Sequence, residues 1–77
     1  MNESQIRACI EAAFAGDSVS VTGDGRHFVA RVVSAQFNGL SRLARHRLVY
    51  AALGDHMRED IHALSIQAIS AEQEHNE

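Results

Sequence analysis

The sequence is poor in the residues that build metal centres and deep hydrophobic cores. It has one cysteine, Cys9, no tryptophan, and only four aromatic side chains in 77 residues. A single cysteine excludes an intramolecular disulfide and a metal site made of this chain's thiolates alone. The core must come from valine, isoleucine, leucine and alanine, and a chain of this length buries only about 60% of the surface that its unfolded form exposes. We expect one small domain with little room for a deep substrate pocket.

The sequence also lacks the features of a membrane protein. No apolar run approaches the roughly 20 residues that a helix needs to cross a bilayer. The first residues carry an acid and no basic cluster, unlike a targeting segment. We therefore expect a soluble, cytoplasmic protein with no membrane partner.

Charge is unevenly distributed along the chain. Ten acidic and seven basic residues give a net charge of -3 with the histidines neutral. This acidic balance argues against tight, nonspecific binding to a phosphate backbone. All seven basic residues are arginines, and three of them, Arg42, Arg45 and Arg47, crowd into one short stretch.

The first half of the chain predicts a helix followed by a hairpin. Asn2 or Ser4 caps a helix that ends at Gly16. Residues 18–22 alternate between polar and apolar, and a glycine-rich turn leads into a second strand over residues 28–33. The positions of this second strand expected to face the core are Phe28, Ala30 and Val32, with Val29 and Val33 only partly covered.

The second half predicts two helices and a final strand. Ser41 caps a helix that continues through Leu53, where Gly54 ends it. This helix is apolar nearly all round, so its buried side stays undecided. A short third helix over residues 56–60 precedes a strand with alternating Leu64, Ile66 and Ala68.

The order of elements is helix, strand, strand, helix, helix, strand, which defines one compact α+β unit. We place this domain at residues 1–70. Residues 71–77 are acidic and lack apolar periodicity, so we expect an acidic, flexible tail that frays or adds a solvated helical turn.

Two of the five histidines lie at junctions between a loop and a strand, His27 after the glycine-rich turn and His62 before the last strand. Position alone favours a half-buried histidine bonded to a backbone carbonyl for His62. For His27 it allows both a ligand that the hairpin positions and an ordinary exposed loop histidine. No two of the other histidines form a metal-binding pair, and Cys9 is best interpreted as a small core residue. No serine, cysteine or lysine stands beside a base, so we expect no enzymatic activity.

Four motifs, in this order and in so short a chain, resemble the BolA family, and within it the IbaG-like branch. They are Gly-Asp-Gly-Arg-His-Phe at residues 23–28, Phe-Asn-Gly-Leu-Ser-Arg at 37–42, Arg-His-Arg-Leu-Val-Tyr at 45–50 and Ile-His-Ala-Leu-Ser-Ile at 61–66. The resemblance implies a fold similar to the type II KH domain, a three-stranded mixed sheet with helices on one face. It also implies a non-enzymatic partner of monothiol glutaredoxins, in iron-sulfur cluster assembly and trafficking or in iron-redox sensing.

The resemblance gives the two junction histidines a role. The histidine matching His62 is the family's usual cluster ligand, and the loop of His27 carries a second ligand. A [2Fe-2S] cluster has four ligands, two on each iron. The resemblance implies that the other two are thiolates, one from the active-site cysteine of the glutaredoxin and one from glutathione.

A second function remains open on the sequence, because some members of the family are DNA-binding regulators. Arg42, Arg45 and Arg47, with Gly54 after them, are similar to a helix-turn-helix in which one helix enters the major groove. A solvated basic face and a protein docking surface explain the same arginines. The Gly-x-x-Gly loop with which a KH domain clamps nucleic acid is missing between the two predicted helices.

Overall fold

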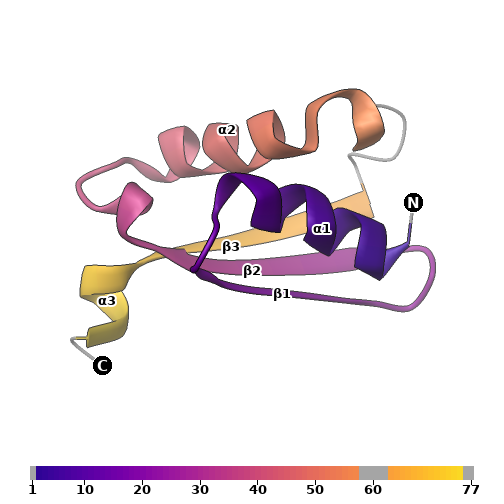
Figure 1. The fold of residues 1–77 in the computed structure, drawn as a ribbon, viewed down its shortest axis with the longest axis horizontal. Helices are drawn as coiled ribbons and strands as arrows, with labels where there is room; N and C mark the ends of the chain where they lie inside the picture. Colours follow the sequence, from indigo (N-terminus) through magenta and orange to yellow (C-terminus); the bar gives the residue numbers. More distant parts are fainter. Residues whose placement is uncertain (1, 58–62, 76–77) are drawn as a thin grey trace.

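The fold is built on a three-stranded mixed sheet, in a computed structural model that describes residues 2–57 and 63–75 (Figure 1). The strands are β1 (Ser18–Gly23), β2 (Phe28–Ser34) and β3 (Leu64–Ser70). They lie in the order β1-β2-β3, with β1 antiparallel and β3 parallel to the central β2. The parallel pair needs a crossover connection, which the second half of the chain supplies.

Two longer helices, α1 (Glu3–Ala13) and α2 (Arg42–Leu53), cover one face of the sheet, as Figure 1 shows. The shorter helical segments are η1 (Ala35–Phe37), η2 (Gly54–Met57) and α3 (Ala71–His75). This arrangement confirms the predicted α+β class with a mixed three-stranded sheet, and it is compatible with the likeness to a type II KH domain.

The third predicted helix differs in kind from what the structure describes. The segment that follows α2 is η2, a single 3-10 turn that starts at Gly54 rather than at residue 56. Residues 58–60 of the predicted helix lie outside the described residues. The last strand begins at Leu64, and His62 lies outside the described residues.

α1 begins where its sequence capping signal lies. The side chain of Asn2 accepts a hydrogen bond from the Gln5 N–H, and the Gln5 side chain accepts one from the Asn2 N–H, both at 2.9 Å. This reciprocal pair satisfies two N–H groups that the first turn leaves without helical partners. The helix ends at Ala13 with Phe14 as its C-cap, earlier than the predicted stop at Gly16.

α2 has the predicted bounds, and the structure decides which side it buries. The Ser41 hydroxyl accepts a hydrogen bond from the Ala44 N–H at 3.2 Å, and Gly54 ends the helix with a φ of 57°. Val49 and Leu53 are buried, whereas Leu43 is 61% exposed. Hydropathy could not separate these faces because apolar side chains lie on both of them.

The core lies between the helices and the inward face of the sheet. Phe28, Ala30 and Val32 are buried, as predicted from the alternation of β2. Phe14 and Phe37 pack with ring centroids 5.3 Å apart and planes tilted by 48°. Tilted aromatic pairs at this distance add to the hydrophobic stabilisation of the core.

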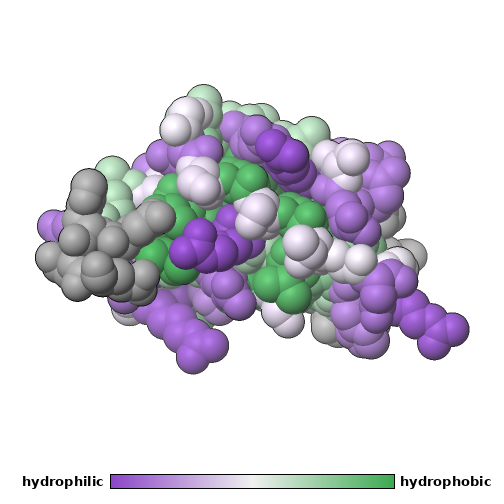
Figure 2. Space-filling model, turned by 90° about the horizontal axis from the view of Figure 1, so that it is seen from below, coloured by the Kyte–Doolittle hydropathy of each residue, from purple (hydrophilic) through white to green (hydrophobic). Residues whose placement is uncertain are grey.

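The opposite face of the sheet carries no long helix and presents a mixed surface. Figure 2 shows this side, with hydrophobic groups separated by hydrophilic ones. On β2, Val29 is 37% exposed and Arg31 is half-buried, but Val33 is 8% exposed and more covered than we expected. Val33 lies opposite Ile69 near the end of the sheet that leads into α3, which packs close to β2 and β3.

None of the helices in the described ranges is long and apolar enough to cross a membrane.

The start of the predicted tail is helical in the structure. Ala71–His75 forms the short helix α3, in which Gln73 accepts hydrogen bonds from the backbone N–H and the hydroxyl of Ser70, both at 3.1 Å. The division of the chain at residue 70 stays a prediction.

Truncation of Phe37 should strongly destabilise the protein. Its side chain has no exposed surface and packs against Phe14, so Phe37→Ala should lower the free energy of unfolding by about 3 to 5 kcal/mol. Urea unfolding monitored by far-UV circular dichroism measures this change. Leu43→Ala is the matched control, because this exposed side chain should change stability by less than about 0.5 kcal/mol. Equal losses in the two variants would show that the core is not where we place it.

Candidate metal-binding loop and basic helix

His27 lies in the loop between β1 and β2, and the carboxylate of Asp24 organises that loop. The Asp24 side chain accepts hydrogen bonds from the backbone N–H of Arg26 at 2.9 Å and of His27 at 2.8 Å. The Asp24 N–H donates to the His27 carbonyl at 3.2 Å. These contacts fix the backbone at His27, while the residue itself is exposed. An imidazole held in this way is available to a ligand from outside.

Gly23, at the start of this loop, cannot be replaced by another residue unless neighbouring atoms of His27 and Phe28 move. A Cβ atom on Gly23 would lie 2.6 Å from the His27 carbonyl oxygen and 2.6 Å from Cδ1 of Phe28. Gly25 has a φ of 94°, in the region that favours glycine. The first glycine thus lets the Phe28 ring lie against the strand, and the second makes the turn.

Asp24 is held in its ionised form by the same contacts. The backbone N–H of His27, followed by that of Arg26, lowers the pKa of the Asp24 carboxyl below its ordinary value. A lowered pKa means that the loop contacts stabilise the folded state above the unfolded pKa of aspartate, and that this contribution is lost as pH falls through the folded pKa. The loop should keep its conformation at neutral and mildly acidic pH.

The pairing of β2 with β3 brings the starts of both strands to the same end of the sheet. Phe28 is the register partner of Leu64, and His27 directly precedes Phe28. The second predicted ligand, His62, lies outside the described residues. Among the residues that are described, no group of three or more histidine, cysteine or acidic side chains is placed to hold a metal ion.

The remaining histidines and the cysteine are dispersed. His56 is exposed in η2, and His46 is half-buried on α2. Cys9 is partly buried and packs against the core cluster. The interpretation of Cys9 as a residue that packs against the core agrees with this position.

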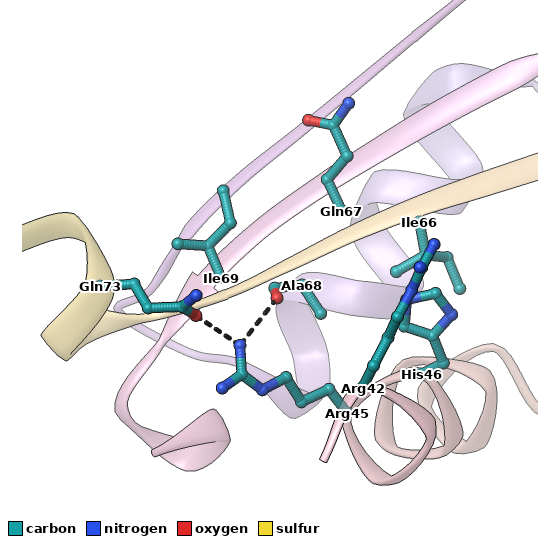
Figure 3. Close-up of a pocket in the computed structure, with 8 residues that line it drawn as sticks. All are labelled: Arg42, Arg45, His46, Ile66, Gln67, Ala68, Ile69 and Gln73. Carbon is teal, nitrogen blue, oxygen red and sulfur yellow. Dashed lines mark hydrogen bonds between the residues drawn. The ribbon is translucent and has the colours of Figure 1, made fainter. Parts of the chain in front are cut away.

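The three arginines of α2 do not form one basic face. Arg45 is engaged, since its guanidinium donates to the carbonyls of Leu40 at 3.0 Å and Ala68 at 3.3 Å and to the side chain of Gln73. Figure 3 shows these contacts to β3 and α3. Arg47 is exposed, and it lies about 200° around the helix from Arg45. Arg42 and Arg45 line one groove, from which Arg47 is absent.

That groove, of about 530 Å³, is bounded by α2, β3 and α3. Sequence reasoning missed both the groove and Gln73, which it assigned to the tail. No local signal identifies this glutamine, because its partner Arg45 is 28 positions away in the chain. The role of Asp24 could have been predicted from the sequence, because aspartate at the start of a turn commonly accepts hydrogen bonds from N–H groups two or three residues later.

The described geometry defines a class of protein: a small α+β domain with a mixed three-stranded sheet, a braced histidine loop and an arginine-bearing crossover helix. A family model described as BolA-like protein matches residues 2–73. The chain belongs to the BolA family, which confirms the resemblance seen in its motifs.

Known relatives agree with this assignment. The structure of a BolA protein homologue from Coxiella burnetii is 42% identical, with a TM-score of 0.81, and the match covers 100% of this chain and 99% of that one. The acid stress protein IbaG of Escherichia coli is 35% identical over 69 residues, covering 88% of this chain and 82% of IbaG. BolA-like protein 1 of Bos taurus is 54% identical over 46 residues, which are 60% of this chain. The match spans 34% of the length of that bovine protein.

The loop contacts of Asp24 give a prediction with a defined pH dependence. The side-chain carboxyl carbon of Asp24 should titrate with a midpoint below the ordinary aspartate range of about pH 4. Two-dimensional NMR across a pH series measures this. In Asp24→Ala the backbone amides of Arg26 and His27 should already be shifted at neutral pH. A wild-type midpoint above the ordinary aspartate pKa would contradict the bracing role.

The contacts of Arg45 predict that lysine cannot replace it. Lysine keeps the charge but lacks the planar guanidinium that reaches two carbonyls and Gln73 together. Arg45→Lys should cost about 1 to 3 kcal/mol in the free energy of unfolding and speed amide exchange in α3. Arg47→Lys on the same helix is the matched control and should change neither. Equal behaviour of the two variants would remove the structural role assigned to Arg45.

Proposed function

We propose that this protein is a non-enzymatic partner of a monothiol glutaredoxin, with which it binds a shared [2Fe-2S] cluster through His27 and His62. It acts in iron-sulfur cluster assembly and trafficking or in iron-redox sensing, in the cytoplasm. The observation that carries this proposal is an exposed imidazole, His27, on a loop braced by Asp24, at the end of the sheet where β3 begins.

Chain length supports the pairing of this imidazole with His62. Leu64 is the partner of Phe28, and paired strands lie about 4.8 Å apart. His62 precedes Leu64 by two residues, and two residues of chain span at most about 7 Å. This length of chain permits both rings to serve one cluster.

The donor set fits half of a cluster and requires a partner for the other half. Two imidazoles leave two positions of a [2Fe-2S] cluster unfilled, and the only thiol of this chain packs against the core. The thiolates come from the cysteine of the glutaredoxin and from glutathione. When bound, the cluster supplies redox chemistry, and replacement of thiolate by imidazole raises its reduction potential.

The imidazole ligands also make binding sensitive to acid. Histidine binds a metal only in its neutral form, so metal affinity falls when the rings are protonated. The Asp24 contacts survive mild acid, so the loop keeps its conformation there. Loss of the cluster at mildly acidic pH should therefore occur without unfolding of the loop.

The alternative, a DNA-binding regulator that uses the helix from Ser41 to Leu53, receives less support. Arg45 is occupied by contacts within the protein, and Arg42 and Arg47 project from different sides of α2. Titration of duplex DNA across a salt series distinguishes the two functions, since phosphate contacts through several arginines produce a steep loss of affinity with salt.

The proposed ligands are tested by reconstitution with a monothiol glutaredoxin, iron, sulfide and glutathione. His62→Ala should abolish the visible circular dichroism of the shared cluster, and His27→Ala should weaken it or change its shape. His56→Ala is the matched control and should leave the spectrum as in the wild type, because this exposed histidine lies in η2. A signal lost only in His62→Ala would restrict the role to that residue, and unchanged spectra in both ligand variants would end the assignment.

A further inference from the structure

β3 is an edge strand, and part of its outer edge is left without a partner. The strand order β1-β2-β3 gives β3 one neighbouring strand, β2. An edge strand presents backbone N–H and C=O groups that a further strand can bind. Native proteins commonly cover such edges, so the parts left open are candidates for recognition.

The contacts of Arg45 and Gln73 identify which residues face this edge. Arg45 donates to the Ala68 carbonyl, and the Ser70 N–H donates to the side chain of Gln73. Backbone groups of successive residues point to opposite edges of a strand, so those of Ile66 face outward together with those of Ala68 and Ser70. Arg45 and Gln73 thus close the C-terminal part of the edge, as Figure 3 shows for Ala68.

In the described structure, the outer edge of β3 has free backbone groups around Ile66, on the N-terminal side of the Arg45 contact. Within the described ranges, the N–H and C=O of Ile66 and the N–H of Ala68 have no hydrogen-bond partner at this edge. The groove of about 530 Å³ lies here, and it is lined by residues from both faces of β3, Ile66 and Ala68 on one and Gln67 and Ile69 on the other. Because residues from both faces of β3 line this groove, the groove runs along the edge of the strand.

Among the described residues that line this groove, two are arginines and none is acidic. Arg42 and His46 reach from α2 toward Ile66, side by side in Figure 3. Arg42 is exposed and forms no ion pair with any described residue. Ile66 keeps only 9% of its surface exposed because its side chain belongs to the core cluster, so an occupant would bind its backbone groups, and a carboxylate on that occupant could pair with Arg42 in the wall of the same groove.

We propose that an extended segment of a partner protein adds to β3 as a fourth strand along Ile66–Ala68, with an acidic side chain of that segment bound to Arg42. Main-chain hydrogen bonds to an exposed edge provide affinity, and side-chain contacts provide selectivity. This interaction surface lies along β3 beside α2 and is independent of the cluster ligands in the proposed function.

A blocked pentapeptide of threonine, valine, glutamate, valine and threonine is the probe. Titrated to millimolar concentration into the full chain, it should shift the NMR signals of Ile66 and Ala68 and slow the exchange of their amide protons. A peptide with glutamine in place of glutamate should bind about three to five times more weakly. N-methylation of the two backbone amides that face β3 should abolish binding, because it removes the donors that a strand needs.

Variants on α2 locate the charge contact. In Arg42→Gln the two peptides should bind equally, whereas Arg47→Gln, on the same helix outside the groove, should keep the preference for glutamate. Absence of binding at millimolar peptide, or binding that survives N-methylation, would overturn the proposal. So would sedimentation of the free chain as a dimer with Ile66 and Ala68 already protected, which would assign the edge to a second copy. None of these outcomes depends on cluster reconstitution.

Discussion

The parallel pairing of β2 with β3 is the constraint on which the rest of the structure depends. Because Phe28 lies opposite Leu64, the loop before β2 and the segment before β3 reach the sheet at the same end. An antiparallel pairing would place those two segments at opposite ends of the sheet. The pairing therefore makes it feasible for histidines far apart in the sequence to serve one cluster, and it leaves β3 at the edge of the sheet.

α2 is the crossover that this pairing requires, and Arg45 fixes it to the sheet. A single guanidinium joins Leu40, in the segment before α2, to the outer edge of β3 and to Gln73 of α3. The arginine that seemed on sequence grounds to be part of a DNA-binding surface is thus a structural residue. Its contacts separate the closed part of the β3 edge from the open part beside Arg42, so one side chain influences both the fold and the available surface.

The sequence predicted those parts of the fold that local chemistry determines. The cap at Ser41, the stop at Gly54 and the inward positions Phe28, Ala30 and Val32 of β2 depend on neighbouring residues, and each is confirmed. The contacts of Gln73 and the groove beside Arg42 depend on residues that meet only after folding, so no sequence period indicates them. The buried side of α2 was undecidable because Leu43 is as apolar as Leu53, although only the latter packs in the core.

The central claim is that His27 and His62 both bind the shared cluster, and nitrogen couplings to its iron test it most directly. The complex with a monothiol glutaredoxin is prepared with ¹⁵N-histidine in this chain only, reduced by one electron, and measured by pulsed electron paramagnetic resonance. We predict strong couplings from two imidazole nitrogens, reduced to one in His27→Ala. A cluster without strongly coupled histidine nitrogen from this chain would contradict it.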